Sequence, residues 1–333
     1  MRERLNMAFT EKRSAAARLM AAATLVVVSS AACAEDYPAR QIKAIVSYSA
    51  GSGADITARH TMAKLSEVLN QNIVVENRPG TSAIVGTDAV AKAAPDGYTL
   101  LFAATQHAVN PKLQKKLPYD TLNDFASVAR VTSQPLFLGV SSTLPVNSVQ
   151  ELIKLIKANP GKYNYASTGI GTSIHLAGAY FVSQAGLEMS HIPYTNQSQA
   201  MVDLGRGEVH IIFYTYQPLE PLVRTGRLKI LGSTGAKRSS WAPDVPTMEE
   251  SGMPGFVMPA WHAVFAPAKT PKPIVEKLES ALATVAQNPD YRKLLEPTGT
   301  DVYYASSKDL TTFLESEIDR FGTILQTAGV TPH

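Results

Sequence analysis

Strand patterns and helix patterns alternate along most of this chain. The apolar strand pattern of residues 42–48 precedes a helix pattern in which Ala58, Met62, Leu65 and Leu69 recur at steps of three and four residues. Further strand patterns cover residues 72–77, 98–104, 135–142, 163–167, 190–194, 208–216 and 228–233. Alternation of this kind predicts an α/β fold with mostly parallel sheets.

The first 34 residues have the features of a secretory signal peptide. Basic residues precede the apolar run LMAAATLVVV, and the small residues Ala32 and Ala34 mark a cleavage site. Cleavage there would remove Cys33, the only cysteine, whereas a lipoprotein would keep Cys33 as its lipid-bearing first residue. Because Ser30 stands where lipoprotein signals carry leucine, we expect cleavage after Ala34.

The mature chain is formally neutral. Removing 34 of 333 residues leaves 299, and the loss of five of 31 basic and two of 28 acidic residues leaves 26 of each. This balance gives no support for nucleic acid or an anionic membrane surface as a partner. The seven histidines have no metal-site spacing, so we expect no metal and no cofactor. A chain of this length without disulfides can bury a sufficient core, as two domains.

A strand, a glycine-bearing turn and a helix occur in succession twice. The first turn, residues 49–54, reads SAGSGA, and the second, residues 168–173, reads TGIGTS. Each alone is explained as a tight connection that needs glycine. The first lacks a Walker A lysine and fails the dinucleotide spacing at Ile56. Because ligands bind at the carboxyl ends of strands, a pair of such turns can face each other across a cleft and hold an anion with N–H groups, hydroxyls and helix dipoles.

Two further functions are compatible with these turns. A secreted hydrolase could use Ser167 or Ser173 with His175, although no serine lies in a G-x-S-x-G elbow. A receptor for an inorganic oxyanion could use the same two turns. Asp55 opens the first helix, where we favour a capping role over contact with a ligand.

Ordered segments throughout the mature chain are similar to one known family. They include YPARQIKAIV, VVENRPG, AKAAPDGYTLL, NPKLQKKLPYDTLNDF, PGKYNYASTGIGTSIHLAG, HIPYTNQSQAMVDLGRGEV and APAKTPKPIVEKL. The chain resembles the Bug family, the extracytoplasmic substrate-binding receptors of tripartite tricarboxylate transporters. The resemblance covers essentially the whole mature chain.

The resemblance implies a two-lobed type II periplasmic binding protein fold. Lobe 1 would comprise residues 36–136 and 257–333, and lobe 2 residues 137–256. It also implies a monomeric periplasmic receptor, not an enzyme, that captures a small organic carboxylate. Its partners would be the membrane components of a tripartite tricarboxylate transporter.

The resemblance also implies the residues of the ligand site. By position, the first turn contributes Tyr48, Ser49, Ala50, Gly51, Ser52, Gly53 and Asp55, and the second contributes Ser167, Thr168, Gly169, Gly171, Thr172 and His175, with Thr81, Ser82, Gln106, Tyr194 and Tyr214 as neighbours. The sequence departs from the family's usual Pro-Gly-Gly turn at Ala50-Gly51-Ser52, and Tyr48 stands where phenylalanine is common.

The tyrosines near these turns bear on the identity of the ligand. Tyr48, Tyr194, Tyr214 and Tyr216 accompany no obvious arginine clamp. Each further buried carboxylate would need its own donors, so a tricarboxylate such as citrate is disfavoured. We expect one clamped carboxylate on a flat or apolar body, as in an aromatic acid or terephthalate, with a mid-length aliphatic diacid as the alternative.

Overall fold

The computed structural model describes residues 37–194, 196–239, 242–327 and 329–332, and of Thr81 only the backbone. The expected signal peptide and Cys33 lie outside the described residues. By its contacts the chain separates into two units after Arg40, and both sheets belong to the unit that begins at Gln41. No helix of the described part is both long and apolar enough to cross a membrane.

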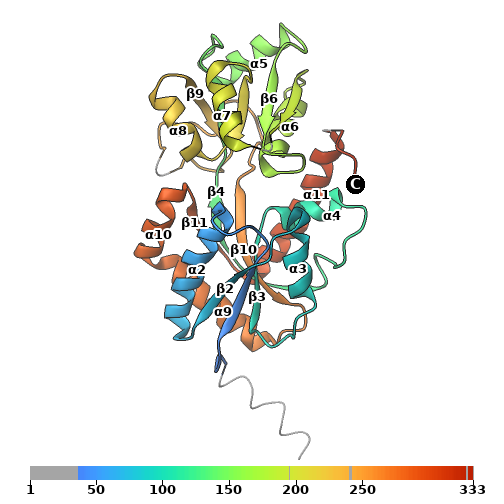
Figure 1. Ribbon diagram of the computed structural model, residues 1–333, viewed down its shortest axis with the longest axis vertical. Helices are drawn as coiled ribbons and strands as arrows, with labels where there is room; N and C mark the ends of the chain where they lie inside the picture. The colour runs from blue at the N-terminus through green and yellow to red at the C-terminus, as the bar shows by residue number, and fades with distance from the viewer. Residues whose placement is uncertain (1–36, 195, 240–241, 328, 333) are drawn as a thin grey trace, which may run out of the picture. The chain divides into compact units, whose positions relative to one another are not determined.

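A six-stranded sheet is built from both ends of this unit (Figure 1). Its strand order is β11 (Asp301–Ala305), β4 (Phe125–Gln134), β10 (Ala260–Pro267), β3 (Thr99–Ala104), β1 (Ile42–Val46) and β2 (Ile73–Asn77). The helices are α2 (Gly53–Leu69), α3 (Ile84–Ala91), α4 (Gln106–Leu113), α9 (Lys272–Gln287), α10 (Pro289–Leu295) and α11 (Ser307–Thr327), with short 3-10 helices at Thr81–Ala83 and Glu296–Thr298. Helices α2, α9 and α10 pack together, and α11 packs against α4.

A five-stranded sheet is built from the middle of the chain. Its order is β7 (Ser190–Pro193), β6 (Asn164–Ser167), β8 (Ile211–Tyr214), β5 (Phe137–Ser141) and β9 (Leu228–Ser233). Its helices are α5 (Val149–Lys157), α6 (Ser173–Gln184), α7 (Gln197–Arg206) and α8 (Tyr216–Arg224). At α5 the sequence motif S-x-x-E gives half of a capping box, because Ser148 Oγ accepts from Glu151 N at 3.1 Å, whereas Glu151 Oε2 accepts at 2.7 Å from Asn147 N, one residue before the cap.

The chain passes between the two sheets at two places. Only residues 135–136 separate β4 from β5, and residues 234–259 lead from β9 back to β10. Sheet membership therefore changes close to the expected lobe boundaries at residues 136–137 and 256–257. The boundaries themselves stay a prediction.

The α/β class is confirmed, and both sheets are mixed. Of the nine strand pairings in the described residues, four are parallel and five antiparallel. We expected mostly parallel pairs, and the parallel pairs are not the majority. The physical reason lies in the connections. A helix crossover returns the chain to the same end of a sheet and gives parallel strands. Strands β4, β5 and β10, at which the chain leaves or enters a sheet, run against their neighbours and make all five antiparallel pairs.

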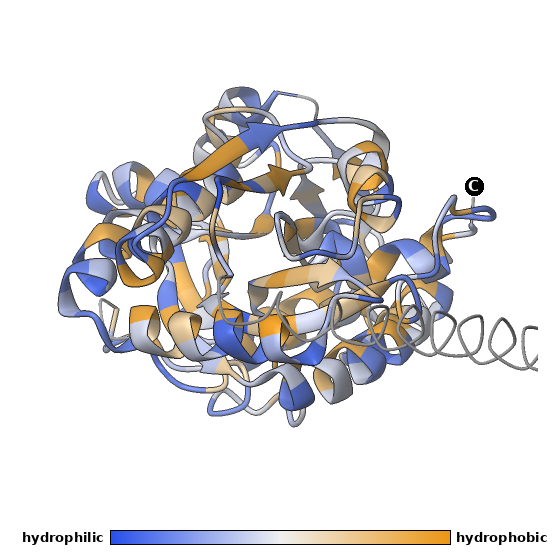
Figure 2. Cartoon of the chain, turned by 90° about the horizontal axis from the view of Figure 1, so that it is seen from below, coloured by the Kyte–Doolittle hydropathy of each residue, from blue (hydrophilic) through white to orange (hydrophobic). Residues whose placement is uncertain are grey.

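One apolar cluster reaches from one sheet to the other. It includes Trp261 and Phe265 of β10, Phe213 of β8 and Phe256 in the returning segment, all 1% exposed or less. In Figure 2 hydrophobic and hydrophilic residues alternate along the helices, as expected of helices with one face on a core. This core packs against strands of both sheets and so fixes the ends of the strands where the predicted site residues lie.

Candidate functional site

The predicted site residues lie at one edge of each sheet. Strand β1 pairs in parallel with β2 and β3, so the chain leaves all three strands at the same edge, towards the first turn, Ser82 and Gln106. Strand β6 pairs in parallel with β7 and β8 in the same way, and its edge carries the second turn, Tyr194 and Tyr214. In both sheets the glycine turn follows the middle strand of the three.

The first turn is held by the residue three positions after its helix cap. Ser52 caps α2, and its Oγ accepts from Asp55 N at 3.3 Å. Gly51, with φ of 79°, donates its N–H to Asp55 Oδ2 at 2.8 Å. Ser49, Ala50, Gly51 and Gly53 are exposed, whereas Asp55 is 2% exposed. The turn thus presents its backbone outward while the aspartate holds it from inside.

Both carboxylate oxygens of Asp55 already have partners. Asn77 Nδ2 donates to Oδ1 at 2.7 Å, and Arg59 Nε lies 3.1 Å from Oδ2. Burial raises the pKa of Asp55, but the hydrogen bonds from Arg59, Asn77 and the Gly51 N–H together lower it below its usual value. Asp55 is therefore ionised, neutralised by Arg59 and committed to the turn. The cap of α2 is Ser52, so Asp55 supports the cap from the first turn of the helix, and contact of Asp55 with a ligand stays a prediction.

The second turn repeats this arrangement with different side chains. Thr172 caps α6, its Oγ1 accepts from His175 N at 3.2 Å, and Gly171, with φ of 78°, donates its N–H to His175 Nδ1 at 3.1 Å. The cap residues have nearly the same backbone conformation, with φ and ψ of −70° and 160° at Ser52 and −69° and 155° at Thr172. His175 therefore takes the place that Asp55 has in the first turn.

His175 belongs to a cluster of rings behind the second turn. Its ring centroid lies 4.1 Å from that of His191, which stacks on Tyr165 at 4.9 Å. Burial, with a smaller contribution from His191, lowers the pKa of His175 to about 4, and burial also lowers the pKa of His191. His175 is therefore neutral at neutral pH, and its Nδ1 acts as an acceptor with the proton on Nε2.

The contact required of a hydrolase is not formed. Ser167 is fully buried, and its Oγ lies 2.7 Å from His191 Nε2 and accepts from Gly169 N at 3.1 Å. In the described part of the chain neither Ser167 nor Ser173 makes a hydrogen bond to the His175 ring. Ser167 is buried between His191 and the turn, Ser173 is half-buried, and neither of these described serines makes the serine–His175 contact that the hydrolase alternative requires.

A buried asparagine joins two of the predicted neighbours. Asn110 Nδ2 donates to the Ser82 carbonyl at 2.8 Å, and Gln106 Nε2 donates to Asn110 Oδ1 at 2.8 Å. Asn110 is 1% exposed. Ser82 and Ala83 both have positive φ, 51° and 63°, a strained conformation for residues with a Cβ. Sequence reasoning did not single out Asn110 or His191, because nothing in the local pattern shows their partners.

The tyrosines are less available than the sequence suggested. Tyr194 donates its hydroxyl to Asp203 Oδ2 at 2.9 Å, and burial, with Asp203, raises its pKa to about 12. Tyr214 is 7% exposed and packs in a core cluster with Phe137. Tyr48 is half-buried, and burial raises its pKa. A tyrosine lining of the site stays a prediction.

The second turn also contacts the six-stranded sheet's helices. A Cβ on Gly171 would lie 2.5 Å from Leu113 Cδ2, so the backbone of this turn is packed directly on the last residue of α4. Helix α11 packs against both α4 and α6. The helix that follows β3 and the turn that follows β6 are therefore neighbours.

The sequence compares closely with one family. The profile described as "Tripartite tricarboxylate transporter family receptor" matches residues 57–330. The chain belongs to this family. A UPF0065 protein of Bordetella pertussis is 36% identical over 318 residues, which are 95% of this chain and 98% of that protein.

Solved structures of the family share the fold. The Rhodopseudomonas palustris protein Rpa4515, solved with adipate, is 32% identical, with a TM-score of 0.76 over 90% of this chain and 100% of that one. MatC from Rhodopseudomonas palustris, solved with bound malate, is 28% identical, with a TM-score of 0.70 over 87% of this chain and 100% of that one. The family comprises periplasmic solute-binding receptors, and the resemblance seen in the sequence is confirmed.

Proposed function

We propose that this protein is a monomeric periplasmic receptor that holds a small organic carboxylate between its two glycine turns and delivers it to a tripartite tricarboxylate transporter. The observation that carries the proposal is the pair of matched turns, Gly51-Ser52 and Gly171-Thr172, at equivalent edges of the two sheets. In this proposal the protein is not an enzyme and needs no cofactor.

The donors in this proposal are the first N–H groups of α2 and α6. In each helix the cap hydroxyl accepts from the third N–H, and the glycine N–H before the cap is used by Asp55 or His175. The first two N–H groups of a helix have no partner within the helix, and here they belong to Gly53, Ala54, Ser173 and Ile174. Two helix N-termini that converge on one carboxylate supply hydrogen bonds and a favourable dipole without a buried ion pair.

For the ligand body we propose a flat or apolar group, as in an aromatic acid or terephthalate, with a mid-length aliphatic diacid as the alternative. The relative solved with adipate supports the aliphatic alternative. Calorimetry of the mature chain with benzoate, terephthalate, adipate and citrate decides between them. Tight binding of citrate and no binding of an aromatic acid would refute the aromatic preference.

The clamp is tested by filling the space in front of Gly53. A Cβ there meets no atom within 4 Å, and the φ of Gly53 is ordinary, so Gly53→Leu leaves the fold intact and places its side chain where the carboxylate would lie. We expect the variant to bind the best carboxylate about tenfold more weakly or worse, a loss of roughly 1.4 kcal/mol or more. The ligand-induced rise in melting temperature should shrink accordingly.

Lys272→Leu is the matched control. Lys272 is the first residue of α9, and its side chain is 87% exposed, so the change adds the same leucine at an equivalent helix position away from both turns. Its affinity should equal that of the wild type. Unchanged carboxylate binding by Gly53→Leu, or no melting shift of the wild type with any carboxylate at millimolar concentration, would refute the proposed function.

A further inference from the structure

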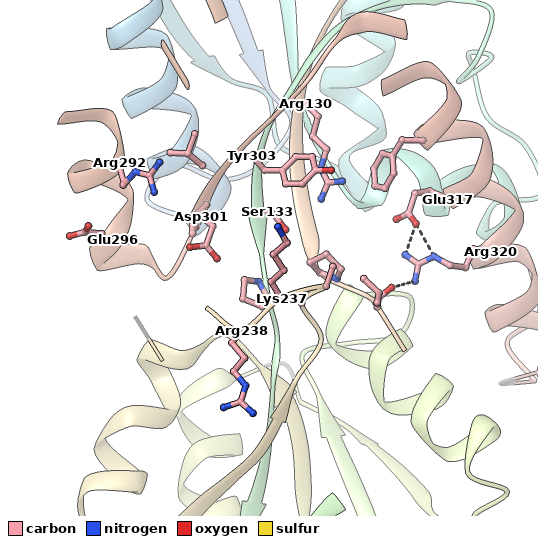
Figure 3. A pocket seen from close by; sticks show the side chains of 18 residues that line it. Arg130, Ser133, Lys237, Arg238, Arg292, Glu296, Asp301, Tyr303, Glu317 and Arg320 are labelled. Carbon is pink, nitrogen blue, oxygen red and sulfur yellow. Dashed lines mark hydrogen bonds and ion pairs between the residues drawn. The ribbon is translucent and has the colours of Figure 1, made fainter. Parts of the chain in front are cut away.

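A cavity of about 490 Å³ lies beside the segments that join the two sheets (Figure 3). Its lining comes from β4, β11 and α11 on one side and from residues 235–238, which follow β9, on the other. None of the residues predicted for the carboxylate clamp lines it. Its volume is that of a typical small-molecule site.

Arg130 is the charged group built into this cavity. Its side chain is 5% exposed, and its guanidinium lies over the ring of Tyr303 at 4.3 Å and the ring of Phe313 at 4.2 Å. In Figure 3 the guanidinium lies beside the Tyr303 ring and points into the cavity. With both faces covered by rings, the edge of the guanidinium is what remains for a ligand, and that edge carries its N–H donors.

Apart from the two rings and the attraction of Glu317, the protein gives Arg130 little compensation. Its one hydrogen bond in the described residues runs from Nε to the Thr132 carbonyl at a long 3.4 Å, and no described carboxylate lies within ion-pair distance. Glu317 accepts instead from Arg320 Nε at 2.8 Å and from Trp261 Nε1 at 3.1 Å. Burial lowers the pKa of Arg130 to about 10, so it remains charged at neutral pH. A buried guanidinium without a carboxylate is costly, and a bound anion would offset that cost.

The rest of the lining also favours an anion with an apolar body. Five basic side chains (Arg130, Lys237, Arg238, Arg292 and Arg320) and three acidic ones (Glu296, Asp301 and Glu317) line the cavity. Arg238 is paired at 2.8 Å with Glu250 outside the lining, so the five basic and four acidic groups leave a net charge of +1. Pro135, Val257, Pro259 and Val302 add apolar surface. A planar carboxylate matches the fork of a guanidinium in a bidentate pair.

We propose that this cavity is a second binding site, distinct from the clamp, which takes a small organic carboxylate through a bidentate contact with Arg130. The lining includes residue 135, between β4 and β5, and residues 235–238, between β9 and β10. A bound molecule would therefore contact both segments that join the two sheets. The site does not depend on the proposed function of the turns.

Calorimetry with benzoate tests the proposal in the mature chain that carries Gly53→Leu, so that the clamp is filled. We expect one benzoate to bind with a dissociation constant on the order of 1 mM or tighter. Adding Arg130→Met should abolish that binding. Arg130→Lys keeps the charge but loses the fork, and should weaken binding about tenfold. Arg224→Met, an exposed arginine of α8 outside the cavity, is the matched control and should bind as the parent does.

The outcomes separate the two sites. Benzoate binding that survives Arg130→Met, or is absent from the Gly53→Leu chain, overturns the second site. If Arg130→Met does not fold, Arg130→Lys and crystals of the mature chain soaked in 4-bromobenzoate decide, since bromine density in the cavity is expected and its absence contradicts the proposal. Loss of binding in Gly53→Leu alone would support the clamp and refute the second site. Inorganic sulfate binding tighter than benzoate would also overturn the assignment to an organic carboxylate.

Discussion

The two glycine turns share one geometry and differ in the side chain that holds it. In each, a glycine with φ near 80° donates its N–H to the residue three positions beyond the helix cap. In the first turn that residue is Asp55, ionised and bonded to Arg59 and Asn77. In the second it is His175, neutral and packed against the ring of His191.

The difference shows that the turn needs an acceptor at this position, and not a particular charge. A carboxylate oxygen and a neutral imidazole nitrogen hold the same backbone conformation. The charge of Asp55 is balanced by Arg59, so neither turn brings an uncompensated negative charge to a site that is proposed to hold an anion. The two acceptors should differ in how much their removal lowers the free energy of unfolding and in how their contributions depend on pH.

The largest effect is expected when the first acceptor is removed. Asp55→Ala removes a buried carboxylate and leaves the Gly51 N–H, Asn77 Nδ2 and Arg59 without their shared partner, and should lower the free energy of unfolding by about 3 kcal/mol. Urea denaturation measures the change. Glu276→Ala, which breaks an exposed pair with Lys272, should cost less than about 0.5 kcal/mol. Equal losses in the two variants would show that Asp55 does not hold the turn.

The pH dependence should separate the two turns. The folded-state pKa of His175, about 4, lies below its ordinary value of 6.5, so the unfolded chain binds the extra proton first. The stability from neutral His175 is present above pH 6.5 and lost as pH falls towards 4. The contribution of Asp55, whose pKa is lowered, persists through this window and is lost only at more acidic pH.

The variant His175→Asn isolates the histidine. An asparagine Oδ1 can accept from the Gly171 N–H but does not titrate. Between pH 6.5 and 4 the free energy of unfolding should therefore fall on the order of 2 kcal/mol further in the wild type than in the variant. Other buried histidines, such as His107 and His262, titrate in both proteins and cancel in the difference. Parallel stability curves for the two proteins would contradict the assignment.

The two glycines with positive φ should differ in their response to alanine. At Gly51 a Cβ meets no atom within 4 Å, so Gly51→Ala should cost only backbone strain, about 1 kcal/mol. At Gly171 the Cβ would also press on Leu113, so Gly171→Ala should cost about 2 kcal/mol. In a Leu113→Ala background the clash is gone, so Gly171→Ala should cost only about 1 kcal/mol there, and the double-mutant cycle should show a coupling energy of about 1 kcal/mol. Additive effects there would place Leu113 away from the turn in solution.

The helix caps should give the smallest effects. Ser52→Ala and Thr172→Ala each remove one hydrogen bond from a helix N–H and should cost about 1 kcal/mol, with the larger loss at Thr172, whose Oγ1 also donates to the Gly169 carbonyl at 2.8 Å. Ser148→Ala, at the cap of α5, should cost as much but leave carboxylate affinity unchanged. If Ser148→Ala lowers the carboxylate affinity as strongly as Ser52→Ala does, the clamp does not bind the ligand.

The sequence predicted the turns better than the sheets around them. Glycines, cap residues and helix periodicity are local signals, so both turns and their helices were found where the structure has them. Strands β4, β10 and β11 were not predicted. Strand β4 interrupts its apolar residues with Arg130, Thr132 and Ser133, whose burial comes from β10, β11 and α11, and no local pattern shows those partners.

Within the site, the contacts that decide roles are not local. Spacing alone shows that Asp55 can cap α2, but not that Asn77 reaches it from the end of β2. His191 lies in β7 and His175 in α6, the helix that follows β6, and the two rings meet only because β6 pairs with β7. The buried Arg130 gave no signal in the sequence, since an arginine in a polar stretch is ordinarily exposed.

The central claim is that one carboxylate group is held by the first N–H groups of both α2 and α6. A crystal structure of the mature chain grown with adipate tests it most directly. The account predicts carboxylate oxygens about 2.7–3.2 Å from backbone nitrogens among Gly53, Ala54, Ser173 and Ile174, with contributions from both helices. Adipate bound with its carboxylates away from both helix starts would contradict the claim.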